Sequence, residues 1–179
     1  MFQAESAAMV LVDVQDALAQ IMFERSRLLT NLTKIVKGMQ LLKVPVIWVE
    51  QNPRRLGPTV PEISALLEGS SPISKMSFSC CGSNDVVKVL NALKHTQIVV
   101  AGIETHVCIY QTARDLVRLG CEVEVVGDAT SSRTPECHAL GLDRIRQCDV
   151  AVTTVETILL EMVRTAESPL FKELLKIIK

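Results

Sequence analysis

The stretch QIVVAGIETHVCIYQTARDLVRL, residues 97–119, decides how this chain folds and where its chemistry lies. Its first part, Ile98 to Ala101, is apolar and short, which indicates a buried strand rather than a helix. Gly102 interrupts the run, and beyond Thr105 the apolar residues recur at helical spacing. The stretch is therefore predicted to form a strand, a turn and a helix.

Cys108 falls in the first turn of the predicted helix. Free backbone N–H groups and the positive end of the helix dipole favour a thiolate at such a position. A cysteine at a strand-to-helix junction is thus placed to act as a nucleophile. The alternative is a small buried hydrophobic residue, which is what most free cysteines are. Position alone leaves both interpretations open.

Outward from this stretch, strand patterns alternate with helix patterns along the whole chain. This order predicts a mostly parallel sheet with helices on both faces, a three-layer α-β-α, doubly wound, Rossmann-like α/β domain over residues 1–179. Ser83 is the expected N-cap of helix 84–93, and Leu140, Leu142 and Ile145 are expected on the apolar side of helix 135–146. Strands are expected at residues 7–12, 45–50, 122–126 and 150–153, helices at 28–42, 62–68, 84–93, 135–146, 154–163 and 169–178, a loop at 51–61, and a short extended piece at 73–78.

The composition limits the classes of partner. Hydrophobic residues make up 48% and charged residues 22%, which is typical of a globular protein. The net charge of −1 and the 3% of aromatic residues argue against nucleic acid or a membrane surface as a partner. A mean hydropathy of +0.28 favours a homo-oligomer. The six cysteines form no C-x-x-C pair, and no signal peptide is recognisable, so we expect reduced thiols and a cytoplasmic location.

Three chemically useful groups are expected at one edge of the sheet. Ligands of such sheets bind at the carboxyl ends of the strands, where Asp13 and the turn before Cys108 fall and which Lys75 can reach. Asp13 is placed to take the thiol proton, and Lys75 to stabilise negative charge. The backbone N–H groups of Glu104 and Cys108 are candidates for an oxyanion hole. Singly, a strand-end aspartate is more often a cap and a lysine is nearly always solvated.

Three segments, LVDVQD with Asp13, ISKMSF with Lys75 and GIETHVCI with Cys108, resemble the signatures of the isochorismatase-like cysteine hydrolase superfamily. The resemblance covers essentially the whole chain. It implies a catalytic Asp13–Lys75–Cys108 triad and a cis peptide bond between Ile103 and Glu104. The loop EQNPRRLGPTVPEI further resembles that of the isochorismatase-domain-containing protein 2 group.

Departures from the superfamily's patterns reduce the number of activities that the resemblance implies for this chain. Isochorismatases proper lack the cysteine, so Cys108 points away from isochorismate hydrolysis. Nicotinamidases of the superfamily bind a metal through Asp and His residues after the second strand. The matching segment here has no histidine and no suitable aspartate, so neither a metal nor another cofactor is expected.

Four further residues are candidates for lining a small-molecule pocket: Gln15, Trp48, Leu56 and His106. His106 lies two positions before Cys108, a spacing that directs two helical side chains apart. The leading hypothesis is a metal-independent cysteine hydrolase that cleaves a small amide-type C–N bond through a Cys108 thioester. A non-catalytic binding or scaffold protein and a thiol-based redox sensor are the alternatives.

Overall fold

The structure is a computed structural model that describes residues 1–179, and its centre is a six-stranded sheet in the order β3-β2-β1-β4-β5-β6. Every neighbouring pair of strands is parallel, as the alternation of strand and helix patterns predicts. The strands are β1 (Ala7–Val12), β2 (Val46–Gln51), β3 (Ile73–Lys75), β4 (Gln97–Ile103), β5 (Glu122–Ser131) and β6 (Ala151–Thr153).

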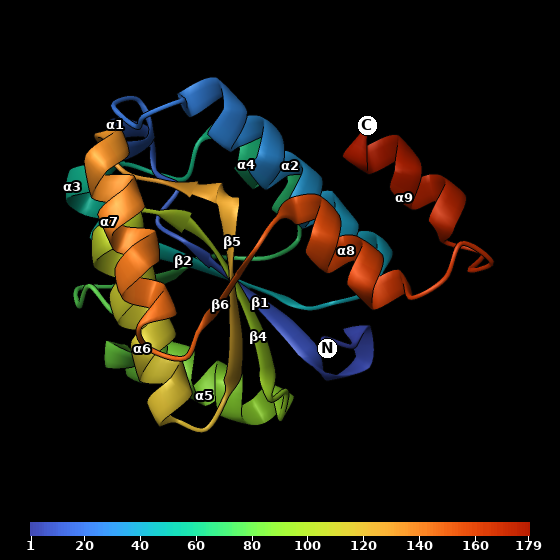
Figure 1. The fold of residues 1–179 in the computed structure, drawn as a ribbon. Helices are drawn as coiled ribbons and strands as arrows, with labels where there is room; N and C mark the ends of the chain where they lie inside the picture. The colour runs from blue at the N-terminus through green and yellow to red at the C-terminus, as the bar shows by residue number, and fades with distance from the viewer.

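Helices cover both faces of this sheet, which confirms the doubly wound architecture. Helices α2, α8 and α9 lie on one face and α5, α6 and α7 on the other (Figure 1). No helix is both long enough and apolar enough to cross a membrane. The helices are α1 (Asp16–Ala19), α2 (Arg25–Leu41), α3 (Pro53–Leu56), α4 (Pro61–Ser64), α5 (Asn84–Leu93), α6 (Tyr110–Arg118), α7 (Pro135–Arg146), α8 (Val155–Val163) and α9 (Phe171–Ile178).

The central strand β1 is buried on both sides, which explains its continuous apolar sequence. Successive side chains point to opposite faces of a strand. Met9 and Leu11 therefore join the core beneath α2 and α8, while Val10 and Val12 join the core beneath α6 and α7. Because neighbouring strands are parallel, the residues that follow them lie at one edge of the sheet.

Several segments differ from the sequence-based expectation. Helix α2 begins at Arg25 rather than at residue 28, β3 ends at Lys75 rather than at residue 78, and the helix expected at 62–68 is α4 followed by a 3-10 turn, Ala65–Leu67. Strand β5 runs on to Ser131 rather than ending at residue 126, because an irregularity in register near Val100 lets Thr130 and Ser131 pair with the last residues of β4. The segment 51–61 is not wholly a loop, since it contains the one-turn helix α3. Pro53 begins that helix, a position at which proline's missing N–H costs nothing.

Two side chains also behave differently from the expectation. Ser83 occupies the N-cap position of α5, but its hydroxyl makes no capping hydrogen bond. The nearby Ser79 hydroxyl instead accepts from the Cys81 N–H. Leu140 is 59% exposed, because helix α7 turns Gly141 and Ile145 toward the core.

Candidate active site

The close approach of β1 and β4 positions the candidate site. Val12 pairs with Gly102, whose φ is +122°, and a Cβ atom added at Gly102 would lie 2.1 Å from the Val12 carbonyl oxygen. Only glycine fits this contact. The two strands therefore bring Asp13 and the turn after β4 to one edge. Helix α2, which comes after β1, and helix α6, which comes after β4, pack on opposite faces of the sheet. This edge is therefore the switch point at which ligands of such sheets bind.

Lys75 and Asp13 form an ion pair that is closed to solvent. The Lys75 Nζ lies 2.7 Å from Asp13 Oδ2, and both side chains are 0% exposed. The same ammonium donates to Gln51 Oε1 at 2.7 Å and to the carbonyl oxygens of Ser77 and Phe78 at 3.1 Å each. Four acceptors surround three N–H donors, so the ammonium is fixed in place beside the carboxylate.

Cys108 lies beside this pair, but not in the first turn of an α-helix as predicted. It lies in a π-helical turn, η4 (Thr105–Ile109), that precedes α6. Its Sγ atom is 4.0 Å from Lys75 Nζ, and the residue is 6% exposed. The Asp13 Oδ1 atom is buried without a hydrogen-bond partner. The site therefore contains one thiol and one carboxylate oxygen that is not engaged elsewhere.

The electrostatics of the site keep the proton on sulfur in the resting protein. Burial raises the pKa of the Cys108 thiol above its usual 9.0, and the negative charge of Asp13 raises it further. This direction is opposite to the expectation of a thiolate stabilised by the helix dipole. Burial also raises the pKa of Asp13 above 3.8, although the positive charge of Lys75 opposes this. Asp13 is therefore a better proton acceptor than a carboxylate in water.

The turn before Cys108 contains the expected cis peptide bond and one of the two N–H groups that were candidates for an oxyanion hole. The peptide bond between Ile103 and Glu104 is cis. The Glu104 N–H has no acceptor in the protein, whereas its carboxylate accepts from the Arg133 backbone N–H and from Arg133 Nε, at 3.2 and 3.0 Å. The Glu104 carboxylate is thus bound to Arg133, while the Glu104 backbone N–H is available to a substrate oxygen.

The four residues predicted to line a pocket have well-defined surroundings. The buried Gln15 amide bonds the backbone of Gln51 and the Gly57 carbonyl, so it joins the segments after β1 and β2. The Trp48 indole N–H donates to the Thr59 hydroxyl at 2.7 Å. Leu56 ends the short helix α3 and is partly exposed, and the His106 ring bonds the Ser132 hydroxyl at 2.9 Å.

Several residues that support the site were missed by the sequence analysis. Gln51 holds Lys75, and its position at the end of β2 was the one available signal. His138 bonds the Thr105 hydroxyl at 2.8 Å, but no local pattern links these two residues. Gly141 of α7 packs so closely against the η4 turn that an added Cβ would lie 2.7 Å from the backbone nitrogen of His106. Helix α7 therefore supports the η4 turn directly.

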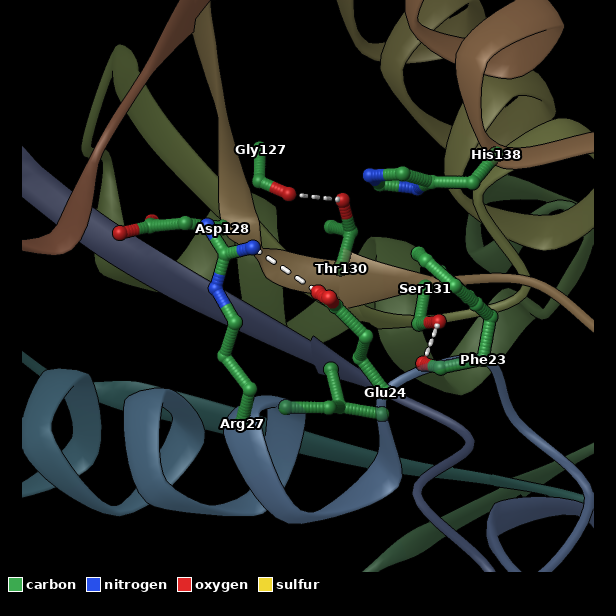
Figure 2. Close-up of a pocket in the computed structure, with 9 residues that line it drawn as sticks. Phe23, Glu24, Arg27, Gly127, Asp128, Thr130, Ser131 and His138 are labelled. Atoms are coloured by element: carbon green, nitrogen blue, oxygen red, sulfur yellow. Dashed lines mark hydrogen bonds and ion pairs between the residues drawn. The ribbon is translucent and has the colours of Figure 1, made fainter. Parts of the chain in front are cut away.

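A small cavity lies beside His138 of helix α7 rather than at the Asp13–Lys75 ion pair. Figure 2 shows it between α2, the end of β5 and α7, with the His138 ring directed into it. Its volume is about 80 Å³, and none of Asp13, Lys75 and Cys108 lines it. No group of three or more His, Cys, Asp or Glu side chains is arranged to hold a metal ion.

Comparisons with known proteins place this geometry in context. The sequence model described as the isochorismatase domain matches residues 7–157. Isochorismatase domain-containing protein 2A of Mus musculus is 38% identical over 98% of this chain and 84% of its own length. The MAR1 ribonuclease structure from Caenorhabditis elegans has a TM-score of 0.93 at 31% identity, over 99% of this chain and 91% of that one. The Escherichia coli YcaC structure, described as an octameric hydrolase of unknown specificity, has a TM-score of 0.87 at 24% identity, over 92% and 82%.

Proposed function

We propose that this chain, which belongs to the isochorismatase family, is a cysteine hydrolase that cleaves a small amide-type C–N bond through a thioester on Cys108. One observation carries the proposal: a thiol lies beside a buried Asp13–Lys75 ion pair whose Asp13 Oδ1 has no partner. A buried acceptor without a donor is costly. The S–H group of Cys108 is the donor proposed for this oxygen, and its proton is the one that Asp13 would accept.

In the first step, the proton moves from Cys108 Sγ to Asp13 Oδ1, and the sulfur attacks the carbonyl carbon of the substrate. The raised pKa of Asp13 makes its carboxylate an effective base for this transfer. The ammonium of Lys75 stabilises the negative charge that remains on the thiolate and the carbonyl oxygen. The backbone N–H groups of Glu104 and Cys108 are proposed to receive that oxygen.

In the second step, Asp13 returns its proton to the leaving nitrogen as the C–N bond breaks, which leaves an acyl group on Cys108. Water then attacks the thioester carbonyl and gives a proton to Asp13. The C–S bond breaks, the carboxylic acid leaves, and Asp13 returns the proton to Cys108 Sγ, which restores the starting state. Lys75 donates to four acceptors in the structure, and the proposed steps do not require it to lose a proton. Its proposed role is electrostatic.

Two similar structures are described as a ribonuclease and as an octameric hydrolase. We do not propose a ribonuclease activity like that named for the C. elegans protein, because a net charge of −1 and few aromatic residues do not favour RNA binding. The octamer described for E. coli YcaC agrees with our proposal that this chain is a homo-oligomer.

The direct test is release of amine from a panel of small primary and secondary amides. Wild-type protein is expected to hydrolyse at least one member, whereas Cys108→Ala is expected to lose activity by at least a thousandfold. Cys121→Ala, which removes a partly exposed cysteine just before the amino end of β5, is the matched control and should retain the rate. Equal rates in wild type and Cys108→Ala would overturn the proposal and favour a binding protein.

A further inference from the structure

Four arginines lie on helices α6 and α7, and only two of them are paired with a carboxylate. On these helices, Arg118 pairs with Asp115 at 3.4 Å and Arg146 pairs with Asp143 at 3.0 Å. Arg114 and Arg144 have no carboxylate within ion-pair distance, although each lies close in sequence to one of those pairs. This face therefore carries two positive charges that the chain does not neutralise.

These two arginines converge on one buried phenol. Arg144 Nη2 donates to the Tyr110 hydroxyl oxygen at 2.9 Å, and Arg114 Nη1 donates to the same oxygen at 3.4 Å. The Arg144 guanidinium also stacks over the Tyr110 ring, 4.4 Å from its centre, and Tyr110 as a whole is 9% exposed. The positively charged Arg114 and Arg144 thus lie near each other because both bind the buried Tyr110.

The arrangement leaves donors without an acceptor. The Tyr110 oxygen receives two N–H groups, and its own O–H hydrogen has no acceptor in the protein. Both guanidiniums keep further N–H groups free, because each has five. The last turn of α7 favours a cation at Arg144, but this effect does not account for the approach of Arg114 to the same oxygen.

We propose that Arg114, Tyr110 and Arg144 form a binding site for a phosphate group, either free or as a monoester of a small molecule. A phosphate dianion matches the two uncompensated charges, and its oxygens accept from guanidinium forks and from a hydroxyl. Such a ligand also removes the repulsion between the two arginines. The exposed Leu140 lies one helical turn before Arg144, so an apolar ester group would find a contact there.

This site is separate from the proposed catalytic residues, and it does not depend on the proposed hydrolysis. Tyr110 begins α6 directly after the η4 turn, and it packs in the core beneath α6 and α7. The phosphate would bind on the outer side of that helix pair, where both arginines are exposed.

Calorimetric titration of the whole protein at constant ionic strength tests the site, with three probes: inorganic phosphate, phenyl phosphate and acetate. Wild type is expected to bind inorganic phosphate or phenyl phosphate saturably. Arg144→Gln and Arg114→Gln are each expected to weaken that affinity roughly tenfold, the loss of one charged hydrogen-bonding partner. Tyr110→Phe removes the hydroxyl and keeps the ring, and a smaller loss is expected.

Arg146→Gln is the matched control, because it removes the same charge from the same helix turn but from a residue paired with Asp143. It is expected to bind within about twofold of wild type. Tighter binding of phenyl phosphate than of inorganic phosphate identifies a monoester as the ligand, and the reverse identifies the free ion. Acetate binding alone, no saturable binding, or equal losses in Arg144→Gln and Arg146→Gln would overturn the proposal. Because the arginines are exposed, circular dichroism is expected to show folded variants.

Discussion

At the scale of single residues, the candidate site depends on two buried and opposite charges, those of Asp13 and Lys75, and each neutralises the other. Asp13 and Lys75 are both 0% exposed in their side chains and 2.7 Å apart. Moving both from water into the interior costs free energy that their attraction only partly returns. The pair is therefore poor as a source of stability, and its retention in the interior fits a role in chemistry.

A double-mutant cycle measures this dependence. Lys75→Met leaves the Asp13 carboxylate buried without its cation, and we expect the free energy of unfolding to fall by about 3–5 kcal/mol at pH 7. Asp13→Asn leaves the Lys75 ammonium in the corresponding position. The double variant removes both charges and is expected to be more stable than the sum of the single losses by at least 1 kcal/mol. Additive losses in urea unfolding would contradict the account.

Buried thiols give the protein a predictable response to alkaline pH. Burial raises the pKa of Cys80 from 9.0 to about 12, so between these values the unfolded chain loses a proton that the folded chain keeps. This stabilisation is complete below pH 9 and is lost as the pH rises toward 12. The free energy of unfolding should fall by about 1.4 kcal/mol per pH unit for this one group.

Cys80→Ala isolates that contribution. Urea unfolding at intervals from pH 8 to pH 10.5 should show a shallower decline in Cys80→Ala than in wild type. The partly exposed Cys137 supplies the comparison, and Cys137→Ala should follow the wild-type slope. Identical slopes in all three proteins would show that Cys80 titrates at the same pH in the folded and unfolded chain.

At the scale of elements, sequence patterns predicted the regular parts well. Strand β1 and helix α7 have the predicted ends, because each is bounded by a strong signal, Asp13 after the strand and Pro135 at the helix start. The η4 turn was not predicted, since a π-helical turn and an α-helical turn place apolar residues too similarly over five positions. The extension of β5 depends on a register shift in its partner β4, which no local pattern records.

Gly102 is the residue at which element packing permits least change. In Gly102→Ala, the new Cβ would lie 2.1 Å from the Val12 carbonyl oxygen at a φ of +122°, and both strands would have to separate. We expect loss of more than 4 kcal/mol of stability, or no folded protein. Gly120→Ala is the control, because Gly120 also has a positive φ, +86°, but open space around it. It should cost about 1 kcal/mol.

Chemical unfolding of both variants provides the comparison. Equal destabilisation by the two substitutions would mean that backbone conformation alone, and not the contact with Val12, accounts for the glycine at position 102.

At the scale of the whole molecule, the site is predictable because parallel strands end at a common edge. That rule places Asp13, Lys75 and the turn before Cys108 together, although long segments of chain separate them. It does not predict that the pair is sealed from water, that Gln51 completes the contacts of Lys75, or that burial keeps the Cys108 proton in place. These properties arise from side chains that meet only after the sheet has formed.

Assembly is a further property at this scale. Met76 and Phe78, which are 73% and 57% exposed, lie one and three residues after Lys75 in the chain. Exposed apolar side chains together with the positive mean hydropathy favour association of copies. Light scattering coupled to size-exclusion chromatography is expected to give a mass of at least two chains, and Phe78→Ser to lower it. A single-chain mass for the wild type would contradict this prediction.

The central claim is that Cys108 is a nucleophile whose proton passes to Asp13, and acyl transfer from p-nitrophenyl acetate tests it most directly. Intact-mass and peptide spectrometry of quenched reactions should find one acetyl group, on Cys108, in the wild type. The same acetylation should be at least a hundredfold slower in folded Asp13→Asn. Acetyl groups spread among the six cysteines, or an unchanged rate in Asp13→Asn, would contradict the account.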